Sequence, residues 1–149
     1  EFGIVNFCNL KQSVRVNPIS PKYLDSKLHS MEAADVLLKN LNPDWIKKTD
    51  FWGQGAISTC AAIIEFLRLH EPQFCTVPHL ISIISWSSYE DMLWLLSLDP
   101  NIAQDISPVL GPILQGAGSQ TAGAQSSLQA PFSKLNTEGN LSNATFQKF

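Results

Sequence analysis

The stretch FWGQGAISTCAAIIEFLRL, residues 51–69, decides how the rest of this chain folds. On a helix, its apolar side chains cover most of the circumference instead of forming a single stripe. A helix of this kind is normally central in a bundle, because every side of it has to be shielded from water. Thr49 or Asp50 can cap its first turn, and Glu71-Pro72 ends it.

Apolar stretches around this central helix predict an all-α fold, a compact bundle of about five to seven helices. The first helix is expected from about Ser30 to Asn42-Pro43, with an inward stripe of Met31, Ala34, Leu37, Leu38 and Leu41. Further helices are expected at about residues 79–84, from the Ser87 cap to the break at Asp99-Pro100, and at about 102–113 and 121–135. Pro108 and Pro112 should kink or interrupt the helix at 102–113, and Pro131 is a defect in the last one.

The helix near residue 90 carries two further signals. Ser87-Ser-Tyr-Glu90 matches a capping box, with Ser87 as the N-cap and Glu90 as N3. Trp86 and Trp94 flank this helix. Aromatic side chains at helical spacing usually belong to the core, so we expect these tryptophans to be buried and not to form a binding site.

The two ends of the chain differ from its centre. Residues 1–20 read as an extended segment that begins with a strand at about 3–10, and two prolines three positions apart hold the following loop extended. Residues 21–136 form the predicted all-α domain. Residues 137–149 form a polar tail.

The stretch HEPQFCTVPHLISII, residues 70–84, places two histidines, a glutamate and a cysteine close together. Each has a structural explanation: His70 suits the negative end of a helix dipole, and Thr76 can cap the next helix with Pro78 in its first turn. Cys75 precedes that cap, so it does not share a helix face with His79. We therefore predict a connection between helices, with no metal site and no nucleophile pair here.

Charge is unevenly distributed along the chain. The net charge is −3, and no Lys or Arg occurs between Arg68 and Lys134. Because gripping phosphates needs several cations on one surface, any DNA contact would fall to the first half. The DNA-binding candidates are Lys11, Arg15, Lys47 and Lys48, with ordinary solvated lysines as the alternative. The protein-docking candidates, which would attract a basic partner, are Glu90, Asp91, Asp99 and Asp105.

Several classes of function lack support in the sequence. The glycines of residues 114–128 have no P-loop pattern and no lysine nearby, so we expect no nucleotide and no other cofactor. Three widely spaced cysteines favour a reducing, cytoplasmic environment over a disulfide framework. A hydrolase that uses Cys75 or a serine lacks a base and an orienting carboxylate at suitable spacing. The remaining hypotheses are a protein-docking module and a DNA-binding domain.

Four motifs carry a resemblance to a known family: residues 5–19 (VNFCNLKQSVRVNPI), 51–56 (FWGQGA), 71–80 (EPQFCTVPHL) and 122–128 (AGAQSSL). With these motifs the sequence resembles the all-α domain of conjugative type IV secretion coupling proteins, the TraG/TraD-type family, particularly its Bacteroidetes-like branch. The resemblance covers most of the chain, and none of the motifs is catalytic.

The resemblance implies a parent protein anchored in the bacterial inner membrane: a hexameric, DNA-dependent ATPase that brings a relaxase–DNA complex to the secretion channel. The helical domain of such proteins is inserted in the motor domain, which residues 1–20 would then border, and contacts relaxase or relaxosome accessory proteins. Walker A, Walker B and transmembrane helices are absent from this sequence. We therefore expect an excised, monomeric, cytoplasmic docking domain that is not an enzyme and makes no direct membrane contact, with DNA as the alternative partner.

Overall fold

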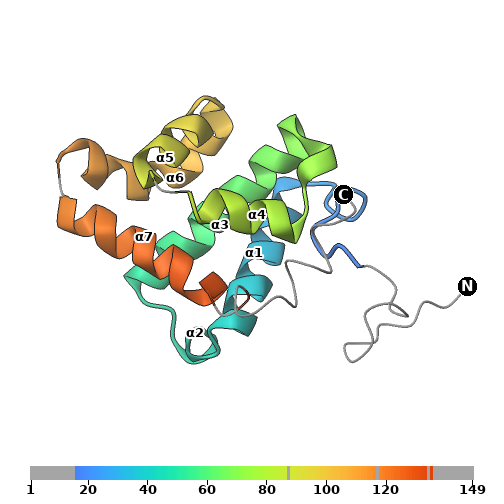
Figure 1. Ribbon diagram of the computed structural model, residues 1–149, viewed down its shortest axis with the longest axis horizontal. Helices are drawn as coiled ribbons and strands as arrows, with labels where there is room; N and C mark the ends of the chain where they lie inside the picture. Colours follow the sequence, from blue (N-terminus) through green and yellow to red (C-terminus); the bar gives the residue numbers. More distant parts are fainter. Residues whose placement is uncertain (1–15, 87, 117, 134, 136–149) are drawn as a thin grey trace, which may run out of the picture.

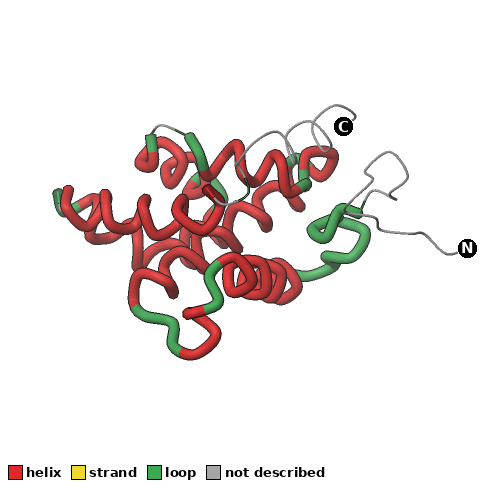
Figure 2. The backbone as a smooth tube through the Cα atoms, turned by 60° about the horizontal axis from the view of Figure 1, so that its bottom comes forward, coloured by secondary structure: helices red, strands yellow, loops and turns green. Residues whose placement is uncertain are grey.

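The computed structural model describes residues 16–86, 88–116, 118–133 and 135. They form seven α-helices and one short 3-10 helix, and this part of the chain contains no strand (Figure 2). The elements are α1 (Lys27–Leu41), α2 (Asp44–Lys47), α3 (Phe51–His70), η1 (Pro72–Phe74), α4 (Val77–Ile84), α5 (Tyr89–Ser97), α6 (Pro100–Leu114) and α7 (Gly118–Ser133). The predicted all-α class is confirmed.

The α3 helix is the centre of the bundle, as predicted. It packs against α1, α4, α5, α6 and α7, which surround it in Figure 1. Ten of its 20 residues are buried, and many of them are small, including Ala56, Cys60 and Ala62. Small side chains let neighbouring helices approach closely, and Ile63, Ile64 and Leu67 of α3 then fill the core between them.

Side-chain caps start most of these helices. Asp50 accepts a hydrogen bond from the Gly53 N–H at 2.7 Å and caps α3, which confirms one of the two expected caps. Thr49 instead bonds the Trp45 carbonyl. Thr76 caps α4 as expected, with Pro78 in the first turn. These caps satisfy backbone donors that have no partner inside the helix.

The first helix differs from its prediction. It begins at Lys27, not near Ser30, because the Ser26 side chain accepts from the His29 N–H and caps it. Ala34 and Leu38 of the expected stripe are fully buried, but Met31 is exposed and Ser30 is buried in its place. Starting three residues earlier does not change the face of the helix. Ser30 turns inward because it binds a buried carboxylate of α3.

The capping box is shifted by one residue from its prediction. Ser88, not Ser87, is the N-cap of α5, and its hydroxyl accepts from the Asp91 N–H at 3.2 Å. Ser87 lies outside the described residues. Asp91 therefore takes the N3 position expected for Glu90, and both carboxylates stand in the first turn of α5, where the helix dipole favours negative charge.

The prediction is that Pro108 and Pro112 kink or interrupt the helix at 102–113. The α6 helix runs unbroken from Pro100 to Leu114, so the interruption does not occur. Proline 108 has no N–H to donate to the Gln104 carbonyl, but the Ser107 hydroxyl donates to that oxygen at 2.8 Å. This hydrogen bond replaces one of the two backbone donors that the prolines remove. The α7 helix likewise runs through Pro131 and begins at Gly118, three residues before the predicted start.

The predicted end segments lie largely outside the described part of the chain, namely residues 1–15 and 136–149. Residues 16–26 contain turns and no helix or strand. Within them Ile19 is buried in the core, and Asn17 donates to the Cys75 carbonyl at 2.7 Å. None of the described helices is both long enough and apolar enough to cross a membrane.

One ion pair is buried in this core. The Glu65 carboxylate of α3 accepts from the Ser30 hydroxyl of α1 at 2.7 Å and from two nitrogens of Arg68 at 2.6 and 2.9 Å. The side chains of Glu65 and Arg68 are only 8% and 17% exposed, so water screens the pair weakly. The Arg68 hydrogen bond holds the Glu65 pKa below its ordinary value against the opposing effect of desolvation, with Ser30 contributing further.

Replacing Glu65→Ala should lower the free energy of unfolding by about 3 kcal/mol, because it leaves the half-buried Arg68 charge and the buried Ser30 hydroxyl without their partner. Urea unfolding at pH 7 measures this change. The exposed Glu32 of α1 is the control, and Glu32→Gln should change the same quantity by less than about 0.5 kcal/mol.

The same pair predicts a dependence on pH. Because folding lowers the Glu65 pKa, its contribution is complete above the unfolded value of about 4.3 and is lost as the pH falls through the lower folded value. Unfolding free energies measured between pH 7 and pH 2 should fall more steeply in the acid range for the natural chain than for Glu65→Gln. Equal slopes would contradict the assignment.

Candidate functional site

The stretch 70–84 joins helices, as the sequence indicated. The His70 Nε2 lies 3.0 Å from an Asp99 oxygen, and the His79 Nδ1 lies 2.7 Å from the Thr76 hydroxyl. The Cys75 thiol is buried and donates to the Ile19 carbonyl at 3.1 Å. Cys75 and His79 therefore have different hydrogen-bond partners. The Cys75 and Thr76 contacts hold the connection between α3 and α4, and the His70–Asp99 contact joins the end of α3 to the start of α6.

The two described cysteines are poor nucleophiles. Burial raises the pKa of Cys60 to about 12 and that of Cys75 to about 11. Only the thiolate attacks, so both thiols are almost entirely unreactive near neutral pH. In the described residues, no three His, Cys, Asp or Glu side chains come together in a group that could hold a metal ion.

The structure divides the four acidic candidates into two pairs. Asp99 caps α6 and contacts His70, whose hydrogen bond lowers the Asp99 pKa. Asp105 of α6 binds Lys27 of α1 with both carboxylate oxygens at 2.7 Å. These two carboxylates thus hold neighbouring elements together. Glu90 and Asp91 are exposed, and neither has a cationic partner among the described residues.

Glu90 and Asp91 share their side of α5 with two exposed apolar side chains. Trp94 is 63% exposed and Leu98 is 59% exposed. At 100° per residue, positions 90, 91, 94 and 98 fall on one side of a helix, opposite Met92, Leu93 and Leu96, which are buried. We call the set of Glu90, Asp91, Trp94 and Leu98 the α5 outer face.

The prediction that Trp86 and Trp94 are core residues is wrong. Trp86 is 46% exposed, and neither side chain reaches the core. Met92, Leu93 and Leu96 already occupy the inward side of α5, and Trp94 lies on the opposite side. A helical projection of residues 89–98 could have separated these two sides, because the acidic residues share one of them with Trp94.

The structure describes two of the four basic candidates. Lys11 and Arg15 lie outside the described residues, while Lys47 and Lys48 are exposed at the end of α2. Of the other described lysines and arginines, Lys27, Lys39 and Arg68 each bind a carboxylate. Only Lys22, Lys47 and Lys48 are then left without an acidic partner in the described part of the chain.

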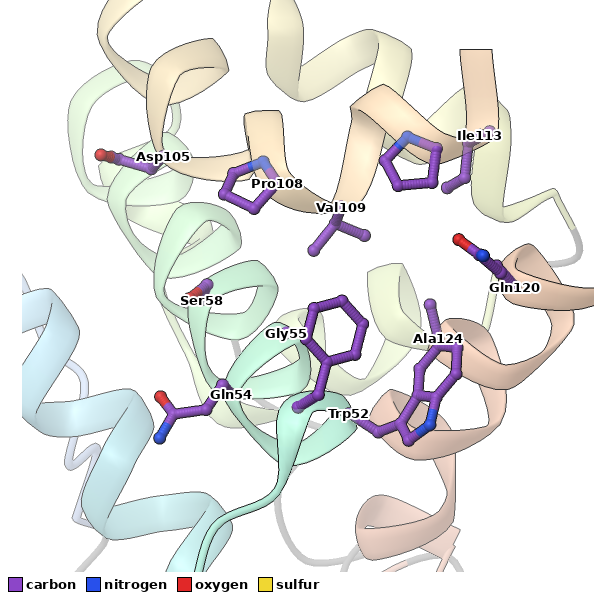
Figure 3. A pocket seen from close by; sticks show the side chains of 12 residues that line it. Trp52, Gln54, Gly55, Ser58, Asp105, Pro108, Val109, Ile113, Gln120 and Ala124 are labelled. Carbon is purple, nitrogen blue, oxygen red and sulfur yellow. The ribbon is translucent and has the colours of Figure 1, made fainter. Parts of the chain in front are cut away.

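A pocket opens where the start of α3 meets α6 and α7 (Figure 3). Its apolar lining includes Phe51, Trp52, Pro108, Val109, Pro112 and Ile113. We call this hollow the α3–α6–α7 pocket. It holds no group of ionisable side chains suited to catalysis, since Asp105 is its only charged lining residue. Sequence reasoning missed it, because it arises between helices that are distant along the chain.

Comparison of the chain with family models, with curated proteins and with solved structures finds no match. The geometry of the described residues therefore carries the functional argument together with the sequence motifs.

The buried thiols predict slow alkylation. In the folded chain at pH 8, Cys60 and Cys75 should react with iodoacetamide roughly 100-fold or more slowly than in the unfolded chain, because their thiolate fractions are very small. Mass mapping of the separate peptides measures each rate, and the same reaction in denaturant is the control. If Cys75 in the folded chain reacts as fast as an exposed thiol, burial does not suppress its reactivity, and Cys75 is again a candidate nucleophile.

Proposed function

We propose that this chain is a substrate-docking domain of a conjugative coupling ATPase, and that it binds a relaxase or a relaxosome accessory protein. The family part of the proposal rests on the four sequence motifs that resemble coupling proteins. The docking part is supported by one structural observation, the α5 outer face, where two unpaired carboxylates lie beside two exposed apolar side chains.

The chemistry of the α5 outer face favours a protein partner with a basic surface. An exposed tryptophan is a frequent energetic centre of protein interfaces, because its large ring loses much water-accessible area at little entropic cost. Carboxylates near it attract basic partners over a distance and speed encounter. No Lys or Arg between residues 68 and 134 opposes that attraction.

The proposal places the catalytic work in another part of the parent protein. The chain would act in the cytoplasm as a recognition unit of a membrane-anchored hexamer, while the motor domain would carry nucleotide and turnover. The encoding reading frame tests the family directly. Membership requires a P-loop upstream of this segment and a Walker B aspartate downstream of it.

Capture of a relaxase tests the docking role. The immobilised chain should retain the relaxase encoded with it at low salt, and retention should weaken as ionic strength rises. Trp94→Ala should reduce the affinity roughly tenfold, because it removes the apolar centre of the surface. The double change Glu90→Gln and Asp91→Asn should reduce it about threefold and flatten the salt dependence.

Matched changes on α1 serve as controls for these variants. Met31→Ala and Glu32→Gln remove one exposed apolar and one exposed acidic side chain from another helix, so they should leave retention unchanged. A natural chain that retains neither relaxase nor accessory protein at low salt would remove the docking proposal. If the α1 and α5 variants lose relaxase retention equally, the α5 outer face is not the docking surface.

A further inference from the structure

The α5 outer face has its charges at one end and its apolar side chains at the other. Glu90 and Asp91 stand in the first turn of α5. Trp94 lies one turn beyond Glu90 and Leu98 one turn beyond Trp94, so these steps are about 6 Å each along the helix axis. Leu98 is the C-cap but keeps helical backbone angles, which leaves its side chain on the same side of the helix. A ligand of this face therefore needs complementary groups in a fixed order.

No other element in the described part of the chain covers this face. The α5 helix packs against α6 and α3, and its buried residues lie on the side opposite Trp94. Figure 1 shows α5 at the edge of the bundle, away from α2. Trp94 and Leu98 are both more than half exposed. Neighbouring large apolar side chains that stay in water are typical of an interaction surface.

The element of a partner that suits this face is a helix. The backbone groups in the middle of α5 bond to one another, so they offer nothing to the backbone of an extended peptide. An extended peptide buried here would keep peptide groups without partners, which is costly. A helix satisfies its own backbone, and its side chains at i and i+4 repeat about every 6 Å, the spacing of Trp94 and Leu98.

Charge complementarity indicates that the partner helix is basic. Glu90 and Asp91 have no cationic partner among the described residues. A second copy of the chain cannot supply one by pairing α5 with α5, because no Lys or Arg occurs between Arg68 and Lys134. That pairing would place carboxylates against carboxylates or against apolar side chains, at a cost in desolvation. A different protein with Lys or Arg beside its apolar side chains provides the missing cations.

The position of the two carboxylates also favours one direction for the partner helix. If the partner helix runs antiparallel to α5, the cations opposite Glu90 and Asp91 lie in its last turn, where the helix dipole stabilises positive charge. In a parallel helix the same cations would lie in the first turn, where the dipole disfavours them. The antiparallel arrangement therefore satisfies the charges of both helices.

We propose that the α5 outer face binds an amphipathic helix of the docked protein, which runs antiparallel to α5. Two apolar side chains of that helix, one turn apart, pack on Trp94 and Leu98. Lys or Arg in its last turn pairs with Glu90 and Asp91. Naming the docked protein as the source of this helix rests on the proposed function. The geometry adds the form of the recognised segment, the order of its side chains and its direction.

Titration with defined helical peptides tests this proposal. The lysine probe is acetyl-AAQAALAAQLAAKKA-amide, whose leucines and lysines share one side of a helix. A glutamine probe has QQ in place of KK, and an alanine probe has alanine in place of both leucines. The readout is the NMR shift of the Trp94 indole N–H at low salt, and circular dichroism of the free probes corrects for their helix content.

The three probes should bind differently. The lysine probe should give saturable shifts with a Kd on the order of 1 mM, because the contact is small. The glutamine probe should bind roughly threefold more weakly, because it lacks the charges that Glu90 and Asp91 attract. The alanine probe should give no saturable shift, because it cannot cover Trp94 and Leu98.

Matched variants of the chain locate the apolar contact. Trp94→Ala, followed through the Leu98 methyl signals, should weaken the lysine probe roughly tenfold. Phe74→Ala removes another exposed aromatic ring, from η1, and should leave the Kd unchanged. Equal weakening by the two variants would overturn the α5 outer face as the binding site of the probe.

A second matched pair of variants tests the charges. Glu90→Gln with Asp91→Asn should abolish the preference for the lysine probe over the glutamine probe. Glu32→Gln with Asp44→Asn removes the same net charge from exposed positions of α1 and α2, and should keep that preference. A preference that survives the α5 change, or that both changes abolish equally, would overturn the role of the two α5 carboxylates.

A nitroxide amino acid at the amino end of the lysine probe tests the direction. Antiparallel binding places the nitroxide near the end of α5, so the amide signal of Leu98 should broaden more than those of Glu90 and Asp91. Stronger broadening at Glu90 and Asp91, or equal broadening at both ends, would overturn the antiparallel direction.

Three outcomes overturn the helix proposal as a whole. They are no saturable shift with the lysine probe, equal binding of the alanine probe, and unchanged binding in Trp94→Ala. Self-association by sedimentation that Trp94→Ala abolishes would instead assign the α5 outer face to a second copy of the chain.

Relaxase capture separates this proposal from the proposed function. If the chain captures the relaxase but binds no probe, the docking function stands and the helical form of the ligand is wrong. If the chain binds the lysine probe but captures neither relaxase nor accessory protein, the helix site stands and the identity of the docked protein is wrong.

Discussion

The need to bury most of α3 is the constraint on which the rest of the structure depends. Because this helix is apolar nearly all round, no two-helix packing could shield it, and five other helices have to surround it. Its one buried carboxylate could not be tolerated alone. Glu65 keeps its charge inside the core only because Arg68 of the same helix and Ser30 of α1 bind it, which fixes the register between the two helices.

The two ends of α3 have different environments as a result. The middle of the helix, residues 59–67, is buried apart from a partly exposed Phe66, and the connection to α4 is held by the buried Cys75 and the Thr76 cap. The first turn extends to the edge of the bundle, so Phe51 is left at the mouth of a pocket, not in the core. The apolar character that demands burial in one part of α3 thus provides an exposed ring in another.

The sequence predicted the class of fold and the central helix correctly, because these depend on periodicity and on local caps such as Asp50 and Thr76. It failed where tertiary contacts choose between local alternatives. Ser30 is buried because of Glu65, a residue 35 positions away, and α6 continues through both of its prolines, with the Ser107 hydroxyl bonding the carbonyl that Pro108 leaves without a donor. The acidic candidates were chosen from charge alone, which cannot tell the lysine-bound Asp105 from the unpaired Glu90.

The distribution of charge connects the fold to recognition. Lys27, Lys39 and Arg68 each form an ion pair within the chain. Three of the six described lysines and arginines are therefore already bound to a carboxylate. The α6 and α7 helices have a single charged residue between them, and their surface is apolar or neutral. Apolar anchors give affinity in protein interfaces, and carboxylates such as Glu90 give direction and speed to encounter. A phosphate backbone, by contrast, would be repelled by the carboxylates of Glu90 and Asp91, which have no cationic partner among the described residues.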